Sequence, residues 1–114
     1  MDEKQKNEEY GFGRFSEYRN MIGYVVLGAP DGFPVEDYLA PDEQMTLDKA
    51  FARLRRGLPV AYDRIKNKDA IRKAAELLEA SYQAYKDGDP RAGAFLLQDF
   101  DDHLLVLRRG PPPK

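Results

Sequence analysis

The sequence contains no cysteine and only one histidine, His103. Without cysteine the chain forms no disulfide and no thiolate metal site, and a single histidine leaves a zinc centre without its usual ligands. The longest apolar run is Met21–Leu27, far below the roughly 20 residues of a membrane-spanning helix. The first residues, MDEKQKNEE, lack the apolar segment of a signal peptide. We therefore expect a soluble cytoplasmic protein that uses no metal or other cofactor.

No large excess of one charge is present, since 18 basic and 20 acidic side chains leave a net charge of −2. This balance gives the chain no broad attraction to nucleic acid or to an anionic membrane. With 114 residues, 42% of them hydrophobic and 33% charged, the chain fits one globular domain. We predict a single all-α domain over residues 12–109, a bundle of four to five helices. We expect a disordered polar arm at residues 1–11 and a Pro-rich tail at residues 110–114.

Apolar residues at helical spacing predict a helix over residues 15–28, with Ser16 as its N-cap. Residues 21–27 are also rich in β-branched side chains, which is typical of a buried strand. The rest of the chain offers no second strand to pair with them, so we predict the helix.

A second amphipathic pattern predicts a helix over residues 43–57. Three arginines stand in its last turn, where their charge complements the helix dipole, and Gly57 is expected to end it. Pro59 then fits the first position of a short further helix through Ile65.

Two long helices are predicted at residues 69–86 and 89–108. Between them, Gly88 suits the left-handed position that ends a helix, Asp89 the N-cap and Pro90 the first turn. A link this short makes the helices antiparallel neighbours, so we expect a C-terminal helical hairpin. The stretch SYQAYKDGDPRAGAFLL resembles the helix–turn–helix unit of tetratricopeptide-type repeats. That architecture stacks about three units, and this sequence has no second copy, so we predict a single hairpin.

A long connection, GAPDGFPVEDYLAPD, spans residues 28–42. Structureless loops of this length are uncommon and often functional. Its apolar residues Phe33, Val35, Tyr38 and Leu39 are expected to pin it onto the domain. We predict that the loop contributes to a partner-binding surface through Asp31, Phe33, Glu36, Asp37 and Tyr38.

Asp99 and His103 lie one turn apart on the last predicted helix, and both project into the flank of its apolar face. At this spacing they can form a direct hydrogen bond or ion pair. Three interpretations stay open: a satisfied polar pair at the edge of the core, a contact in a partner interface, and a metal or catalytic site. Asp101 and Asp102 fall on the polar side of the same helix and are expected to be solvated.

Basic residues are concentrated in the segment 49–68, which spans two predicted helices and the turn between them. Such a segment could be a helix-turn-helix that faces phosphates. The second helix lacks an evident set of base-reading side chains, and arginines in a last helical turn are common dipole partners. A nucleic-acid-binding regulator is our alternative prediction, with the residues Arg53, Arg55, Arg56, Arg64 and Lys66.

A more remote alternative is a Mg²⁺-dependent hydrolase. All-α nucleotide pyrophosphohydrolases carry E-E-x-x-E on one helix and E/D-x-x-D on a later one, and this chain resembles them at Glu76–Glu79 and Asp99–Asp102. The resemblance implies that these carboxylates would converge on magnesium. Ala75 stands where the doubled glutamate would be, and the two glutamates are predicted to face away from the apolar stripe of their helix.

Other catalytic motifs are absent from the sequence. The glycines of Gly11-Phe-Gly13 do not continue into a phosphate-binding loop, and neither serine stands in a nucleophile motif. We therefore predict a small, non-enzymatic protein–protein interaction module. It would act as an adaptor or regulator, or as an antitoxin or immunity-type protein that masks a partner protein.

Overall fold

The computed structural model describes residues 2–62 and 65–109, and within these ranges the chain is helical without any β-strand. The predicted all-α class and the C-terminal antiparallel hairpin are confirmed. No helix in these ranges is both long and apolar enough to cross a membrane. The predicted tail at residues 110–114 lies outside the described residues. In chain order the elements are α1 (Glu3–Tyr10), α2 (Phe15–Gly28), the 3₁₀ turn η1 (Pro41–Glu43), α3 (Leu47–Tyr62), α4 (Lys68–Lys86) and α5 (Pro90–Arg109).

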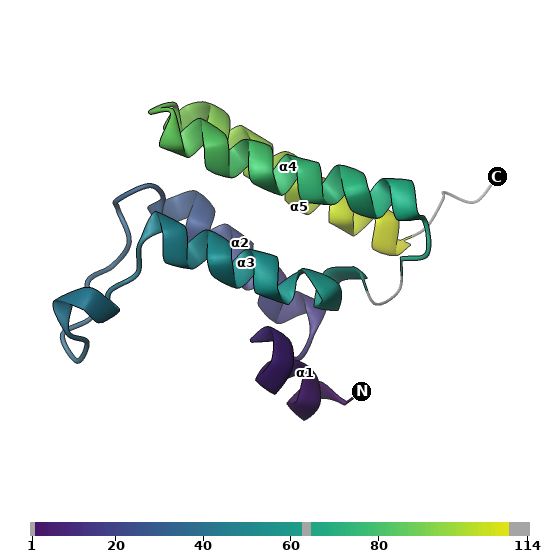
Figure 1. Cartoon of the computed structure of the whole chain (residues 1–114), viewed down its shortest axis with the longest axis horizontal. Helices are drawn as coiled ribbons and strands as arrows, with labels where there is room; N and C mark the ends of the chain where they lie inside the picture. The colour runs from purple at the N-terminus through teal and green to yellow at the C-terminus, as the bar shows by residue number, and fades with distance from the viewer. Residues whose placement is uncertain (1, 63–64, 110–114) are drawn as a thin grey trace.

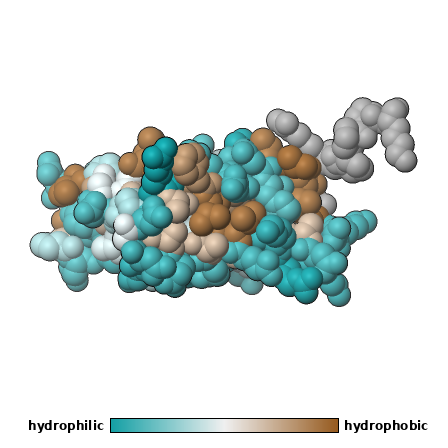
Figure 2. Space-filling view, turned by 90° about the horizontal axis from the view of Figure 1, so that it is seen from above, coloured by the Kyte–Doolittle hydropathy of each residue, from teal (hydrophilic) through white to brown (hydrophobic). Residues whose placement is uncertain are grey.

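The helices form two layers. The α4–α5 hairpin forms one layer and runs alongside the layer of α2 and α3, with α5 packed against α2, and α1 packs against α3 at the edge of the molecule (Figure 1). Burial of each large apolar side chain in the core stabilises the fold by about 1.5–3 kcal/mol. The outer face of the hairpin, which faces the viewer in Figure 2, mixes polar surface with apolar surface. Phe95 and Val106 of α5 are exposed apolar side chains. Fully buried between the layers are Tyr18, Phe51, Leu54, Leu78, Leu97 and Phe100.

The turn between α4 and α5 has the predicted form. Gly88 has a φ of +84°, in the left-handed region, and Asp89 Oδ1 accepts a hydrogen bond at 3.1 Å from the backbone N–H three residues later. Behind the turn, the Ser81 hydroxyl donates to the carbonyl oxygen of Gly93 at 2.7 Å. A Cβ at position 93 would lie 2.7 Å from Tyr85 Cδ2, so glycine is needed for the close approach of the two helices.

Residues 15–28 form a helix and not a strand, as predicted, but Ser16 is not its N-cap. α2 begins at Phe15, and Arg14 occupies the N-cap position with no side-chain hydrogen bond to the first turn. Ser16 therefore lies inside the helix. Tertiary contacts fix this end instead, since Tyr18 is fully buried and its hydroxyl donates to the carbonyl oxygen of Leu54 at 2.7 Å.

The predicted end of α3 at Gly57 is wrong, because the helix continues through Gly57 and Pro59 to Tyr62. Gly57 is a packing residue: a Cβ there would lie 2.3 Å from Cδ2 of Phe12. The two residues after Pro59 are buried, and their burial keeps the last turn helical. The separate short helix expected to reach Ile65 is not formed, since Ile65 lies outside any helix.

The N-terminal segment, expected to be a disordered arm, contains the helix α1. Asp2 and Gln5 form a reciprocal capping box at its start, in which Asp2 Oδ1 accepts from the Gln5 N–H at 2.8 Å. At its end, the guanidinium of Arg56 donates to the carbonyl oxygens of Glu8 and Glu9 at 2.8 and 3.0 Å. No side chain of α1 is buried. The helix therefore has no apolar face, and its sequence shows no amphipathic pattern.

Candidate binding pocket

The connection between α2 and α3, residues 29–46, is held by specific contacts although η1 is its only helical turn. Phe33 is buried beneath it against the last turn of α2. The Gln44 side chain ties the loop across: its amide nitrogen donates to the carbonyl oxygens of Glu36 and Leu39, and its oxygen accepts from the Glu36 N–H, each at 2.9 Å. The loop therefore has a defined shape.

Four apolar loop residues were expected to anchor the loop on the domain, but only one of them is buried. Phe33 is buried and Leu39 is half-buried, whereas Val35 and Tyr38 are 78% and 81% exposed. The hydrogen bonds of the Gln44 amide supply the fixation that was expected from the other two side chains. Val35 and Tyr38 are thus available for contacts outside the fold.

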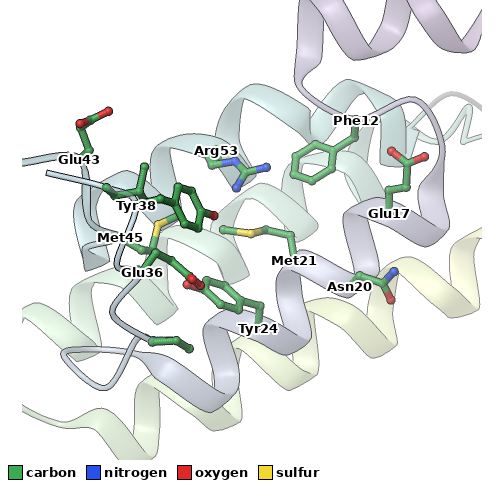
Figure 3. Close-up of a pocket in the computed structure, with 12 residues that line it drawn as sticks. Phe12, Glu17, Asn20, Met21, Tyr24, Glu36, Tyr38, Glu43, Met45 and Arg53 are labelled. Carbon is green, nitrogen blue, oxygen red and sulfur yellow. The ribbon is translucent and has the colours of Figure 1, made fainter.

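A pocket of about 510 Å³ lies between this loop, α2 and α3 (Figure 3). Its apolar lining comes from three places: Met21 and Tyr24 of α2, Tyr38 and Met45 of the loop, and Phe12 from the turn before α2. Methionine thioethers adapt to differently shaped apolar groups. A concave surface of this composition suits the apolar part of a ligand.

Three glutamates line the pocket, and they differ in what their carboxylates already bind. Glu17 Oε2 accepts from the Gly13 N–H at 3.2 Å, and its Oε1 lies 3.5 Å from Arg14 Nε. Glu43 Oε1 accepts from a loop N–H at 3.1 Å, and the side chain points away from the pocket centre in Figure 3. The Glu36 carboxylate forms no hydrogen bond or ion pair with the described part of the chain. Glu36 is therefore the carboxylate that is free to bind a ligand.

Arg53 is the one cation among the described residues that line the pocket. Its guanidinium carbon lies 5.5 Å from the centroid of the Phe12 ring, a cation–π arrangement. In the view of Figure 3, Arg53 and Glu17 are drawn on the Phe12 side of the pocket, and Glu36 on the Tyr24 side.

The structure brings together only part of the partner-binding set predicted in the loop. Glu36 and Tyr38 both line the pocket. Asp31 and Asp37 are exposed on the loop but do not line it. Phe33 belongs to the core, where it positions the loop and has no surface to offer a partner.

Asp99 and His103 lie on the hairpin and not in the pocket lining. His103 is half-buried, and its Nε2 lies 3.1 Å from the carbonyl oxygen of Ala70, while Asp99 is exposed and makes no hydrogen bond to His103 in the described structure. Asp101, expected to be solvated, instead accepts two hydrogen bonds from Arg19 of α2, both at 2.9 Å. This bidentate contact raises the pKa of the Arg19 guanidinium and joins the two helix layers.

The arginines of the basic segment point in different directions. Arg55 forms a bidentate ion pair with Glu79 of α4, at 2.7 and 2.8 Å. Arg56 donates to the end of α1, and Arg53 turns toward the pocket. The three side chains therefore form no continuous basic surface. The other two residues of the nucleic-acid prediction are Lys66, which is exposed, and Arg64, which lies outside the described residues.

The carboxylates that resemble a magnesium motif do not converge. Glu79 is engaged by Arg55, and Glu76 and Asp102 are exposed on different helices. Among residues 2–62 and 65–109, no three histidine, aspartate or glutamate side chains are placed to hold a metal ion.

Met21, Tyr24 and Met45 were not singled out by the sequence analysis. Met21 and Tyr24 lie in the apolar segment 21–27, for which only the choice between helix and strand was considered. Met21 is only 7% exposed and also belongs to the core, so its place in the apolar pattern does not distinguish a pocket residue from a core residue.

No protein-family model matches the chain, and comparisons with curated proteins and with solved structures give no match. The function is therefore argued from the pocket.

Proposed function

We propose that this protein is a non-enzymatic binding module that holds a segment of a partner protein in the pocket beneath the 29–46 loop. The observation that carries the proposal is Tyr38. Its side chain is 81% exposed on a loop of defined shape, and it forms one wall of the pocket. Exposed aromatic residues beside a concave apolar surface are typical anchors of protein interfaces.

The size of the pocket fits a peptide segment better than a whole domain surface. A volume of about 510 Å³ is within the usual range for ligand sites and accommodates a few side chains. The exposed Val35 lies on the same loop and would extend the contact beyond the pocket. An adaptor, a regulator and an antitoxin or immunity-type protein would all use such a site, and the identity of the partner separates them.

The chemistry of the lining supports binding over catalysis. Among the described residues that line the pocket there is no serine, cysteine, lysine or histidine, and the one unpaired carboxylate, that of Glu36, has no second group hydrogen-bonded to it. A covalent or acid–base mechanism requires a nucleophile or base held by a second group. The lining instead offers apolar surface, aromatic faces and a few charged side chains.

A capture experiment with two matched variants tests the proposal. The immobilised protein is incubated with an extract of the organism that encodes it, and bound proteins are quantified by mass spectrometry. Tyr38→Ala removes the exposed wall of the pocket, while Phe95→Ala removes an exposed aromatic residue of α5 that does not line the pocket. Both side chains are mostly exposed, so neither change disturbs the core.

We expect a protein that the wild type and Phe95→Ala retain and that Tyr38→Ala retains about 30-fold less, the effect of losing a central aromatic anchor. A photo-crosslinking residue at position 38 should then join to the same protein. Retention unchanged by Tyr38→Ala would show that the pocket is not the binding site.

A further inference from the structure

The loop that forms the outer wall of the pocket carries charge of one sign only. Residues 29–46 include five acidic side chains and no basic one. Its carboxylates raise the negative potential at the pocket mouth, where a partner segment has to enter. A positively charged segment is attracted there before any contact forms.

Glu36 presents its carboxylate inside this mouth. The backbone N–H and carbonyl oxygen of Glu36 are both hydrogen-bonded to the Gln44 side chain, and this fixes the position of the Glu36 backbone. In the view of Figure 3, Glu36 lies between Tyr38 and Tyr24, and all three line the same pocket. A pocket lined by an unpaired carboxylate and by aromatic rings is a suitable environment for a cation.

We propose that the pocket binds a lysine or arginine side chain of the partner, with its charge at the Glu36 carboxylate and near the rings of Tyr24 and Tyr38. This inference rests on the proposed function and specifies its ligand. The aliphatic stem of such a side chain would lie against Met21 and Met45, as long basic side chains commonly pack their stems on apolar surface. The partner segment is therefore basic, with a cationic anchor residue.

The position of Arg53 agrees with a cation at the Glu36 end rather than an anion in the pocket centre. Arg53 is turned to the Phe12 ring, away from Glu36 (Figure 3). An acidic segment entering over the 29–46 loop would meet its carboxylates first and would be repelled.

The test uses a phage-displayed library of random dodecapeptides as the probe. Peptides are selected on the wild-type protein, and those that also bind Tyr38→Ala are removed, so that only pocket-dependent peptides remain. The strongest of these is synthesised and titrated into the wild type, Glu36→Gln and Asp37→Asn by calorimetry. Asp37→Asn is the matched control, because it removes the same charge from the next residue without altering the pocket lining.

We expect lysine or arginine to be enriched at one position, and Glu36→Gln to weaken binding at least about tenfold, the effect of losing a charged hydrogen bond. Asp37→Asn should change the affinity less than about twofold, in line with a screened surface charge. Pocket-dependent peptides without a basic residue, or equal effects of the two variants, would overturn the cation site and leave the proposed function standing. Absence of any Tyr38-dependent peptide would overturn both.

Discussion

Two glycines inside helices, Gly57 and Gly23, have opposite consequences for stability. A Cβ at Gly57 would lie 2.3 Å from the Phe12 ring and 3.1 Å from the Tyr18 ring, whereas nothing lies within 4 Å of a Cβ at Gly23. Glycine costs a helix about 1 kcal/mol relative to alanine when no contact requires it. Gly57 is thus required by packing, and Gly23 is a weak point of α2.

We predict that Gly23→Ala raises the free energy of unfolding by about 0.5–1 kcal/mol, since it only improves helix propensity. Gly57→Ala should lower it by about 1–3 kcal/mol, because displacement of Phe12 outweighs the same gain. Urea unfolding followed by circular dichroism measures both changes. Stabilisation by Gly57→Ala would show that Phe12 does not pack on α3 as described.

Two buried tyrosines differ in the bonding of their hydroxyl groups. The Tyr18 hydroxyl donates to the carbonyl oxygen of Leu54 at 2.7 Å, while the buried Tyr85 hydroxyl has no partner among the described residues. A buried polar group without a partner costs stability, and its removal relieves that cost.

Tyr85→Phe should therefore leave the free energy of unfolding unchanged or raise it by up to about 1 kcal/mol. Tyr18→Phe, the same chemical change, should lower it by about 1 kcal/mol through loss of its hydrogen bond. Thermal and urea unfolding of the two variants distinguish these effects. Equal destabilisation by both substitutions would contradict the described difference.

At the scale of single elements, α1 is the helix that depends most on another part of the chain. It has eight residues and no buried side chain, so it is too short and too polar to be stable alone. We predict that Arg56→Ala, which removes the donor to Glu8 and Glu9, speeds amide hydrogen exchange of Glu3–Tyr10 at least about tenfold. Exchange in α4 and α5 should not change.

Arg55→Ala is the control for this measurement. Arg55 is the preceding residue of α3, but its ion pair is with Glu79 of α4, so α1 should keep its protection. If both variants expose α1 equally, Arg56 is not the specific contact that holds it.

The helices that could be predicted are those whose signals lie within the helix itself. α2, α4 and α5 have apolar residues at helical spacing, and the α4–α5 turn carries its signal in Gly88, Asp89 and Pro90. The failures involve distant residues: α1 is bound by Arg56, which is 47 and 48 residues from its partners. Gly57 was interpreted as a helix end because its packing contact with Phe12 joins residues that are distant in the sequence. A side chain at position 57 would collide with the Phe12 ring.

The candidate pocket could be predicted only in part for the same reason. Glu36 and Tyr38 were recognised because a long loop with exposed aromatic and acidic residues is a local feature. Met21 and Arg53 are in helices with ordinary patterns, and no local signal shows that the loop folds back over them. The pocket exists only once α2, α3 and the 29–46 loop are assembled.

At the scale of the whole molecule, buried tyrosines make the free energy of unfolding depend on pH in the alkaline range. Burial raises the pKa of Tyr62 to about 12, and it also raises those of Tyr18 and Tyr85. A tyrosine in the unfolded chain ionises at about pH 10, as in model peptides. Above that pH the unfolded chain binds fewer protons than the folded one, so the free energy of unfolding falls as pH rises.

We therefore predict full stability below about pH 10 and progressive loss between about pH 10 and 12. Tyrosinate absorbance should show that these three tyrosines ionise only together with the loss of helical circular dichroism. Tyr62→Phe should reduce the slope of the loss. Titration of all seven tyrosines near their ordinary pKa in a protein that stays helical would contradict the described burial.

The helices form the framework of the molecule, and the 29–46 loop forms the outer wall of the pocket. This division affects which parts of the sequence can vary without loss of the fold. The helices hold nearly all of the core, whereas the 29–46 loop contributes Phe33 as its one buried anchor. The chain entropy lost in closing a loop rises slowly with length, by roughly 0.6 kcal/mol for each doubling. New loop sequences that keep Phe33 and Gln44 can therefore be accepted at little cost to folding. Specificity can diversify through this one segment, in evolution or by design, while the helical framework remains the same.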